Sequence, residues 1–458
     1  MKVIICGAGQ VGFNIARHLA SEQHDVTVID RSPELIAKIQ SSLDVQAIVG
    51  YASHPDLLER AGARDADMII AVTLFDEVNM MACQVAHSLF DVPKKIARVR
   101  AQNYLKPMWQ DLFSRDHMPI DVIISPELEV AEAVLRRLEV PGAFDMVPFC
   151  DDLVRAVGVR LREDCPVVDT PLRQLTELFP DLNIVVTSII RDGKLIIPSS
   201  DDQLLVGDNI YFVAEKCHVE RALSVFGRDE EEARKIVIVG GGNVGSYIAK
   251  RLIHNDSKIQ IKIIEFNSDR ANTIAKDIPN AIVLNGDALD VDIQKEANVK
   301  TAGTIISVTN DDKVNILSSL LAKQAGCKRA ITLINNHTFG PLTYSVGIDA
   351  FVDPRQTTVS SILQHMRRGR IRSLQNLAGG AAEVLEAIAL ETSPLVGRPL
   401  REVRLPAGII IGSVVRNNEV IVPKGGTIIK PDDIVVIFTR LEMIKKVEEL
   451  FSVRLEYF

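Results

Sequence analysis

The sequence predicts an α/β protein with two large domains built on doubly wound parallel sheets, each followed by a small α+β domain. Three observations support this fold class. Short aliphatic runs alternate with segments of helical length, most of the chain occurs twice, and the pattern changes once within each half. Alternating strands and helices indicate a parallel sheet covered on both faces. Hydrophobic residues make up 47% of the chain but aromatic residues only 5%, as strands buried on both faces require.

The duplication is visible as four segments that return in the same order along the chain. The pairs are 1–12 with 234–245, 49–52 with 285–288, 72–79 with 308–315, and 190–198 with 415–423. Chance similarity does not keep its order over four segments. We therefore expect four domains in the order large, small, large, small, at residues 1–140, 141–228, 233–372 and 373–458.

Each half starts with a strand-and-helix pattern and ends with a different one. In the first half, the expected parallel strands are 3–6, 26–30, 45–49, 68–72, 96–99 and 122–124. The small domain reads as strands at 154–159, 184–190, 194–197 and 209–213 with a closing helix at 219–226. Within it, Asp192-Gly193 is typical of a tight hairpin turn.

Composition excludes several classes of protein. The 52 basic and 60 acidic residues give a net charge of −8, which argues against a general nucleic-acid-binding protein. The longest nearly apolar stretch, 405–415, is far shorter than the roughly 20 residues of a membrane span. The six cysteines contain no C-x-x-C pair, so neither a disulfide framework nor a zinc site is indicated. We expect a reduced, cytoplasmic protein.

The strongest motif is Gly7-x-Gly9-x-x-Gly12, which follows the first strand and opens a helix. Glycines at this spacing permit a tight turn, backbone approach to a pyrophosphate and close helix–strand packing, while the helix N-terminus attracts anions. Asp30 ends the second strand, where a carboxylate can accept both ribose hydroxyls and would repel a 2′-phosphate. The motif predicts a Rossmann-like site for NAD(H) rather than NADP(H), although an adenine mononucleotide satisfies the same features.

The second half repeats this motif as Gly240-x-Gly242-x-x-Gly245, with Glu265 in the place of the aspartate. One glycine motif is a weak signal, because a strand-to-helix turn can need glycines merely to pack. Two copies, each with its acid, favour two nucleotide sites.

Other residues at the carboxyl ends of the strands have two interpretations each. Segments 50–53 and 286–289 either wall an adenine pocket or form a turn and helix cap. Arg98 and Arg100 follow the fifth strand and either hold a phosphate or form ion pairs, whereas the second half has Leu333 and Asn335 there. We expect the two carboxylates behind the fourth strands, Asp76 and Asp312, to be helix N-caps.

The sequence offers no catalytic residues and no metal site. Nine histidines occur without a metal-binding spacing, and neither a nucleophile elbow nor a P-loop is present. A dehydrogenase normally pairs one dinucleotide domain with a substrate domain that supplies an acid or base. An NAD-dependent oxidoreductase acting on a small substrate is therefore the alternative, and a nucleotide sensor is the preferred interpretation. A redox-sensing DNA regulator is disfavoured by the charge.

Several segments resemble one family, the TrkA-type regulatory subunits of bacterial Trk potassium uptake systems. The resemblance lies in the sequence of 7–12 (GAGQVG), in His54-Pro55, in 76–80 (DEVNM) with 82–86 (ACQVA), and in 96–100 (IARVR) and 124–127 (ISPE). It covers the whole chain, including the duplication. It implies RCK-N (KTN) large domains and RCK-C (TrkA-C) small domains.

The resemblance further implies a peripheral protein on the cytoplasmic side of the inner membrane, bound to a potassium-translocating subunit. It implies a ring-like homo-oligomer, expected to be a tetramer, and control of the gate by NAD(H) and by ATP or ADP. Carried over by position, the binding residues in the first half are Gly7, Ala8, Gly9, Gln10, Val11, Asp30, Thr73, Leu74 and Arg98. Those in the second half are Gly240, Gly241, Gly242, Asn243, Val244, Glu265, Thr309 and Asn310.

Overall fold

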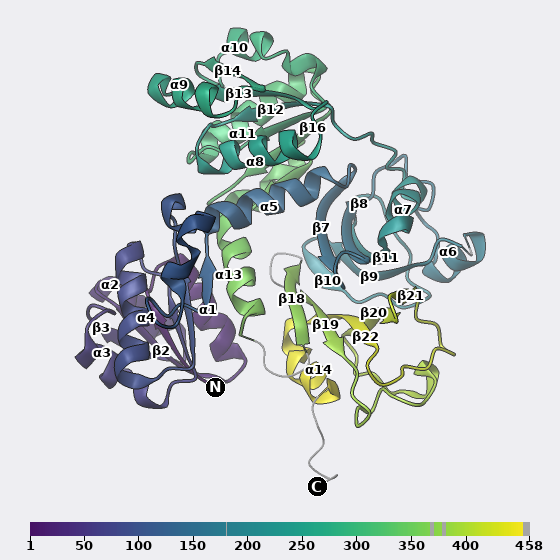
Figure 1. Ribbon diagram of the computed structural model, residues 1–458. Helices are drawn as coiled ribbons and strands as arrows, with labels where there is room; N and C mark the ends of the chain where they lie inside the picture. Colours follow the sequence, from purple (N-terminus) through teal and green to yellow (C-terminus); the bar gives the residue numbers. More distant parts are fainter. Residues whose placement is uncertain (180, 367–370, 378–381, 452–458) are drawn as a thin grey trace. The chain divides into compact units, whose positions relative to one another are not determined.

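The computed structural model describes residues 1–179, 181–366, 371–377 and 382–451 (Figure 1). The chain divides into two compact units, one of Met1–Val130 with Pro354–Met366 and one of Ala131–Asp353 with Arg367–Phe458. Four sheets carry the fold, two large and parallel, two small and antiparallel. The predicted fold class is confirmed. No described helix is long and apolar enough to cross a membrane.

The first unit is built on a six-stranded parallel sheet in the order β3-β2-β1-β4-β5-β6. Its strands are β1 (Lys2–Cys6), β2 (Asp25–Asp30), β3 (Gln46–Val49), β4 (Met68–Ala71), β5 (Lys94–Arg98) and β6 (Val122–Ile124). Its helices are α1 (Gln10–Ser21), α2 (Pro33–Ser42), α3 (Pro55–Arg60) and α4 (Asp76–Phe90). The strand order reverses beside β1, which is where ligands bind in doubly wound sheets.

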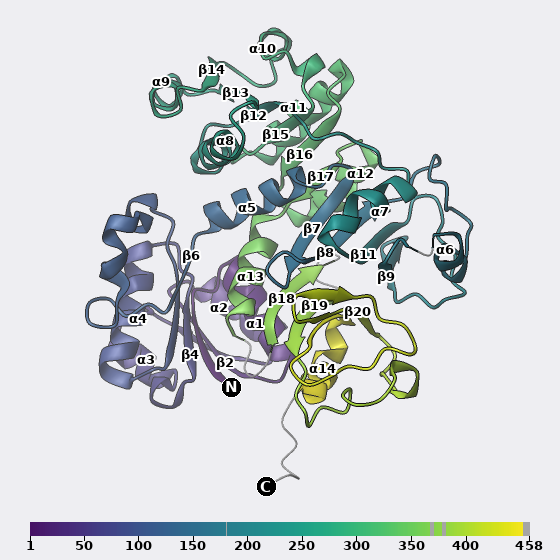
Figure 2. The same ribbon diagram turned by 45° about the vertical axis from the view of Figure 1, so that its right-hand side comes forward.

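A helix from the second half of the sequence completes this unit. Helix α13 (Pro354–Gln364) packs against α1 and β6, as Figure 2 shows. Just beyond it, the backbone carbonyl of His365 accepts a hydrogen bond from the Lys94 side chain. The two halves of the sequence are therefore interleaved.

The second unit contains the other large sheet and both small ones. The large sheet has the order β14-β13-β12-β15-β16-β17, the same topology as the first. Its strands are β12 (Lys235–Val239), β13 (Gln260–Glu265), β14 (Ala281–Asn285), β15 (Thr304–Ser307), β16 (Arg329–Leu333) and β17 (Ala350–Val352). Its helices are α8 (Asn243–Asn255), α9 (Ser268–Asp277), α10 (Val291–Glu296), α11 (Asp312–Ala325) and α12 (Gly340–Ser345). Helix α5 (Pro126–Leu138) reaches α8, where Tyr247 donates a 2.7 Å hydrogen bond to Glu132.

Each small sheet has five antiparallel strands, in the orders β10-β9-β11-β8-β7 and β18-β19-β22-β20-β21. The first contains β7 (Ala143–Phe149), β8 (Val154–Arg160), β9 (Ile184–Arg191), β10 (Lys194–Ile196) and β11 (Asn209–Glu215), with α6 (Leu172–Leu178) and α7 (Val219–Val225). The second contains β18 (Ile371–Leu377), β19 (Ala382–Ile388), β20 (Ile409–Arg416), β21 (Glu419–Ile421) and β22 (Ile434–Arg440), with α14 (Ile444–Phe451). The hairpin at Asp192-Gly193 is present, both residues having positive φ. Strand β7 and helix α6 were not predicted.

Candidate nucleotide-binding sites

The first glycine turn connects β1 to α1, and its three glycines are needed for different reasons. Gly7 has a φ of +114° and donates a 2.8 Å hydrogen bond to the Ile29 carbonyl. A Cβ on Gly12 would lie 1.9 Å from the Gly7 carbonyl oxygen, so the backbone itself requires glycine there. A Cβ on Gly9 would have no atom of the chain within 4 Å. Packing therefore explains Gly7 and Gly12, whereas the space beside Gly9 is open to a ligand.

The second turn, between β12 and α8, shows the same difference between glycines needed for packing and a glycine beside open space. Gly240 has a φ of +99° and donates to the Ile264 carbonyl at 2.9 Å. A Cβ on Gly245 would lie 2.0 Å from the Gly240 carbonyl oxygen, while one on Gly242 would have no neighbour within 4 Å. The same position of the motif is open in both copies.

The carboxylate that ends the second strand of each sheet is bonded to the glycine turn. Asp30 accepts hydrogen bonds from the backbone amides of Ala8 at 2.7 Å and Ser32 at 2.8 Å. Glu265 accepts from Gly241 at 2.7 Å and Asn267 at 2.8 Å. The structure thus brings each predicted acid to its predicted loop, at the edge where the ribose of a dinucleotide would lie.

Both helices after these turns begin without a negative charge. Helix α1 starts at Gln10 and α8 at Asn243, and neither has an acidic residue in its first turn or a side-chain cap. By contrast, α4 has two acidic residues in its first turn. Gln10 and Asn243 are exposed, while Val11 and Val244 are half-buried. Free amides and an uncompensated helix dipole make such an N-terminus suited to a phosphate.

A buried asparagine joins the ends of β4 and β5 in the first sheet. The fully buried Asn79 accepts from both the amide and the hydroxyl of Thr73, at 2.8 and 2.7 Å, and donates to the Arg98 carbonyl at 2.9 Å. The Arg98 guanidinium donates to the Thr73 carbonyl at 2.5 Å. Its Nε atom is buried without a partner, and burial lowers the pKa of the group. This guanidinium has hydrogen-bonding capacity left for an anion.

The second sheet keeps the asparagine but not the arginine. Asn315 accepts from Thr309 at 2.8 and 2.7 Å and donates to the carbonyl of the buried Leu333 at 3.0 Å. A different cation lies here: Arg270, on the first turn of α9, donates to the Gly241 carbonyl at 2.9 Å. It also donates to Ser246 at 3.3 Å. The arginine that bonds to Thr73 in the first sheet thus comes from β5, whereas the one that bonds to the second glycine turn comes from α9.

Sequence reasoning missed Asn79, Asn315 and Arg270. The two asparagines occupy matching positions in the repeat, which was the available signal. No pattern in the sequence indicated Arg270, because its contact with the glycine turn depends on how α9 packs.

The expectation that Asp76 and Asp312 are N-caps was wrong. Each is the first residue of its helix rather than the cap. Asp76 accepts from the amides of Arg100 and Ala101 at 2.9 and 2.8 Å, and Asp312 makes the matching bonds to the segment after β16. These carboxylates fix the chain after the fifth strand, since each accepts hydrogen bonds from two successive backbone amides there.

The remaining predicted residues are distributed as follows. Arg100 forms an ion pair with Glu127 at 2.9 Å, so the ion-pair interpretation holds for this arginine. Leu74 is 64% exposed, and Asn310 is exposed at the equivalent position.

The two segments expected either to wall an adenine pocket or to form a turn, 50–53 and 286–289, differ in structure. In the first segment, Tyr51 is exposed and stacks on His54. In the second, Asp287 accepts from the Leu289 amide at 2.9 Å, which is a turn.

One group of metal-ligating side chains occurs in the described part of the chain. Glu215 ends β11, Cys217 and His218 follow it, and the ligand atoms of the three lie within 4.8 Å of one another. None of the three belongs to either glycine turn, and Cys217 is exposed. Nothing connects it with the candidate sites.

Comparisons with known proteins follow the domain pattern. A family model of the TrkA-N domain matches residues 3–126 and 236–354, and one of the TrkA-C domain matches 156–227 and 384–452. The chain is 55% identical over 458 residues to the Trk system potassium uptake protein TrkA of Azorhizobium caulinodans, covering 100% of both chains. It is 40% identical over 462 residues to that of Halomonas elongata, again covering 100% of both.

Two solved structures have a similar fold. A structure of the GsuK channel matches 99% of this chain and 79% of its own, with a TM-score of 0.59 and 17% identity. A structure of the GsuK channel bound to NAD has the same coverage, a TM-score of 0.58 and 16% identity. At these identities the similarity shows the fold alone.

Proposed function

The chain belongs to the TrkA family of Trk potassium uptake proteins, and we propose that it is a nucleotide-sensing regulatory subunit that gates a potassium-translocating membrane subunit. The observation that carries the proposal is the duplicated glycine turn, in which the position facing open space is glycine in both copies. The protein would act at the cytoplasmic face of the inner membrane as a peripheral subunit. Its four domains would be residues 1–140, 141–228, 233–372 and 373–458.

The residues at each turn suit NAD(H). Gly7 to Val11 and Gly240 to Val244 would present backbone amides to the phosphates, because both helix N-termini lack acidic residues. Asp30 and Glu265 would accept from the adenosine ribose, and Thr73, Leu74, Thr309 and Asn310 would line the sites. The GsuK channel, which shares this fold, has been solved with NAD. When bound, the nucleotide supplies the negative charge and bulk that the loops accommodate.

The two sites would differ in their phosphate contacts. Arg98 reaches the first site from β5, whereas Arg270 reaches the second from α9. Because the cations come from different directions, we propose that the sites rank NAD(H), ATP and ADP differently. A ring of this chain, a tetramer in our proposal, would transmit the difference to the membrane subunit. A ligand shifts such an equilibrium only by its differential affinity for the two ring shapes, typically about 1–3 kcal/mol.

The test is potassium flux through the co-expressed membrane subunit in vesicles, with and without this protein, loaded with NADH, ATP or ADP. We expect flux that requires the protein and changes with the nucleotide. Asp30→Ala should blunt the response to the ligand of the first site, and Glu265→Ala that of the second. Flux indifferent to both protein and nucleotide would overturn the proposal. Substrate-dependent absorbance change at 340 nm would instead support the oxidoreductase alternative.

A further inference from the structure

A basic cleft lies in the second unit, and none of its lining residues belongs to either glycine turn. A cleft of about 790 Å³ lies between the first small sheet and the second large sheet, and residues 228–233, which connect the two halves of the sequence, form part of its wall. Cavities of about 300–1,000 Å³ are typical of small-molecule sites. The cleft is therefore large enough for a ligand the size of a nucleoside monophosphate.

The charge of the cleft is opposite to that of the chain. Six basic side chains line it against four acidic ones, although the whole chain carries −8. The basic residues are Arg160, Arg162, Arg228, Lys323, Lys328 and Arg329, and the acidic ones are Asp229, Glu230, Glu231 and Asp349. The excess of two positive charges matches one phosphomonoester, which carries about −1.5 to −2 at pH 7.

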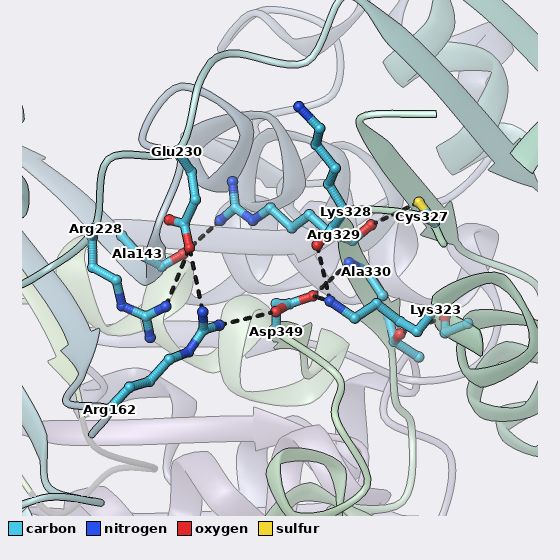
Figure 3. A network of polar contacts seen from close by, with 12 residues as sticks. Ala143, Arg162, Arg228, Glu230, Lys323, Cys327, Lys328, Arg329, Ala330 and Asp349 are labelled. Atoms are coloured by element: carbon cyan, nitrogen blue, oxygen red, sulfur yellow. Dashed lines mark hydrogen bonds and ion pairs between the residues drawn. The ribbon is translucent and has the colours of Figure 1, made fainter. Parts of the chain in front are cut away.

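Two of the acids hold the basic groups in place, as Figure 3 shows. Glu230 forms ion pairs with Arg228 at 3.2 Å and with Arg162 at 3.7 Å. Asp349 pairs with Lys323 at 2.9 Å and with Arg162 at 3.6 Å. Arg162 therefore contacts both carboxylates, each at a long distance. Because its side chain is half-exposed, it can reorient toward an anion that it would contact at a shorter distance.

Two guanidinium groups at the cleft are buried, and one of them has a nitrogen without a partner. Arg329 is only 8% exposed and donates to the Ala143 carbonyl at 2.5 Å, and burial lowers its pKa to about 10. Arg228 is 6% exposed, donates to the Arg160 carbonyl at 2.7 Å, and has a buried Nε atom without a partner. A buried charge of this kind is costly unless an anion or further hydrogen bonds compensate it.

The connecting segment is packed tightly on both sides of the cleft. A Cβ on Gly142 would lie 2.2 Å from the Glu230 carboxylate, and one on Gly303 would lie 2.8 Å from the Ala233 side chain. The connecting segment, which carries Arg228, is thus held by packing at Gly303, and this favours a preformed position for that arginine.

We propose that this cleft binds a small phosphomonoester, with Arg162, Arg228 and Arg329 as its phosphate ligands. Planar guanidinium groups suit phosphate because each can donate two parallel hydrogen bonds. The site joins the first small domain to the second large one, so occupancy would hold these two elements together. This inference does not depend on nucleotide binding at the glycine turns.

The test uses a full-length background in which both glycine turns are blocked. Gly9→Glu and Gly242→Glu place negative side chains where the structure leaves open space, so the fold should persist while phosphates are repelled from the turns. Binding of AMP and of inorganic phosphate to this background is measured by isothermal titration calorimetry. We expect one site per chain, with AMP binding more tightly if the cleft also accommodates the nucleoside.

Arg162→Gln and Arg329→Gln in that background should each weaken binding at least about tenfold, the usual effect of removing a hydrogen bond to a charged group. Arg64→Gln is the matched control, because it removes an ion-paired surface arginine that is not among the lining residues. Arg162 is exposed, so its variant should fold, which circular dichroism would verify. The absence of binding in the blocked background would overturn the proposal, and so would affinity unchanged by Arg162→Gln. Weakening by Arg64→Gln to the same extent would show a non-specific charge effect and would also overturn it.

Discussion

The Asp30 carboxylate accepts a 2.7 Å hydrogen bond from the Ala8 amide, tying the end of β2 to the turn that follows β1. The equivalent bond joins Glu265 to Gly241 at the same distance. The acid that would hold a ribose therefore also holds the loop that would receive the phosphates. Nucleotide binding and loop geometry would be coupled through one side chain in each half.

This coupling predicts the effect of Asp30→Ala. We expect NADH affinity at the first site to fall about 10- to 100-fold, because a charged acceptor is lost. Stability should fall by about 1–3 kcal/mol, since the amides of the buried Ala8 and the half-buried Ser32 lose a charged acceptor. Calorimetric titration and urea unfolding measure the two quantities. Asp25→Ala, at the exposed opposite end of the same strand, is the control and should change neither. Unchanged NADH affinity in the Asp30 variant would contradict the assignment of the first site.

Substitutions at two glycines of the first turn should distinguish the glycine needed for packing from the glycine needed for nucleotide binding. Gly12→Ala would place a Cβ 1.9 Å from the Gly7 carbonyl oxygen, so we expect a loss of about 3 kcal/mol, the upper part of the usual range for overpacking. Gly9→Val should leave the free energy of unfolding nearly unchanged, because its side chain meets open space, yet it should obstruct nucleotide binding. Urea unfolding and NADH titration of both variants test the distinction. Equal destabilisation by the two substitutions would show that the open position is not a ligand position.

The parallel sheets were predictable because their strands are buried on both faces and read as short aliphatic runs. In β1, for example, Val3 to Cys6 are all fully buried. Strand β7 was missed because Asp145 and Pro148 interrupt its apolar pattern. The packing of α13 onto α1 could not be read from local sequence, since it depends on contacts between residues more than 300 positions apart.

Contacts at the candidate sites could be anticipated where local geometry decides them, but not where packing does. The glycine motif and its acid follow from one strand–turn–helix unit, so Asp30 and Glu265 were expected beside the turns, where they lie. Their contact with a nucleotide stays a prediction. The N-cap expectation for Asp76 failed because tertiary structure gave its carboxylate the amides of Arg100 and Ala101 to bind. Arg270 was missed for the same reason.

The two cations predict independent effects at the two sites. Arg98→Gln should weaken nucleotide binding at the first turn alone, and Arg270→Gln at the second turn alone, each about tenfold. Arg98→Gln should cost little stability, because it removes a buried charge whose Nε atom has no partner. NADH titration in a Gly242→Glu background reports on the first site alone, and titration in a Gly9→Glu background reports on the second site alone. If both substitutions weakened the same site, the two turns would not be separate sites with their own cations.

The cysteines provide a prediction about reactivity and pH. Five of the six are buried, and burial raises the pKa of Cys83 and Cys150 to about 12, whereas Cys217 is exposed. Only the thiolate reacts with DTNB, so we expect the native protein to show one reactive thiol at pH 8 and the Cys217→Ser variant none.

The raised pKa values of the buried cysteines also determine whether stability rises or falls with pH. Because the folded-state pKa values lie above the unfolded value of about 8.5, the unfolded chain loses these protons first as pH rises. The contribution of the buried thiols to stability is complete below about pH 8.5 and is lost progressively toward pH 12. Urea midpoints should therefore fall from pH 9 to 10.5, and substitution of Cys83 by Ala should reduce that slope. Two or more thiols reacting at pH 8 without unfolding would contradict the buried positions of these side chains.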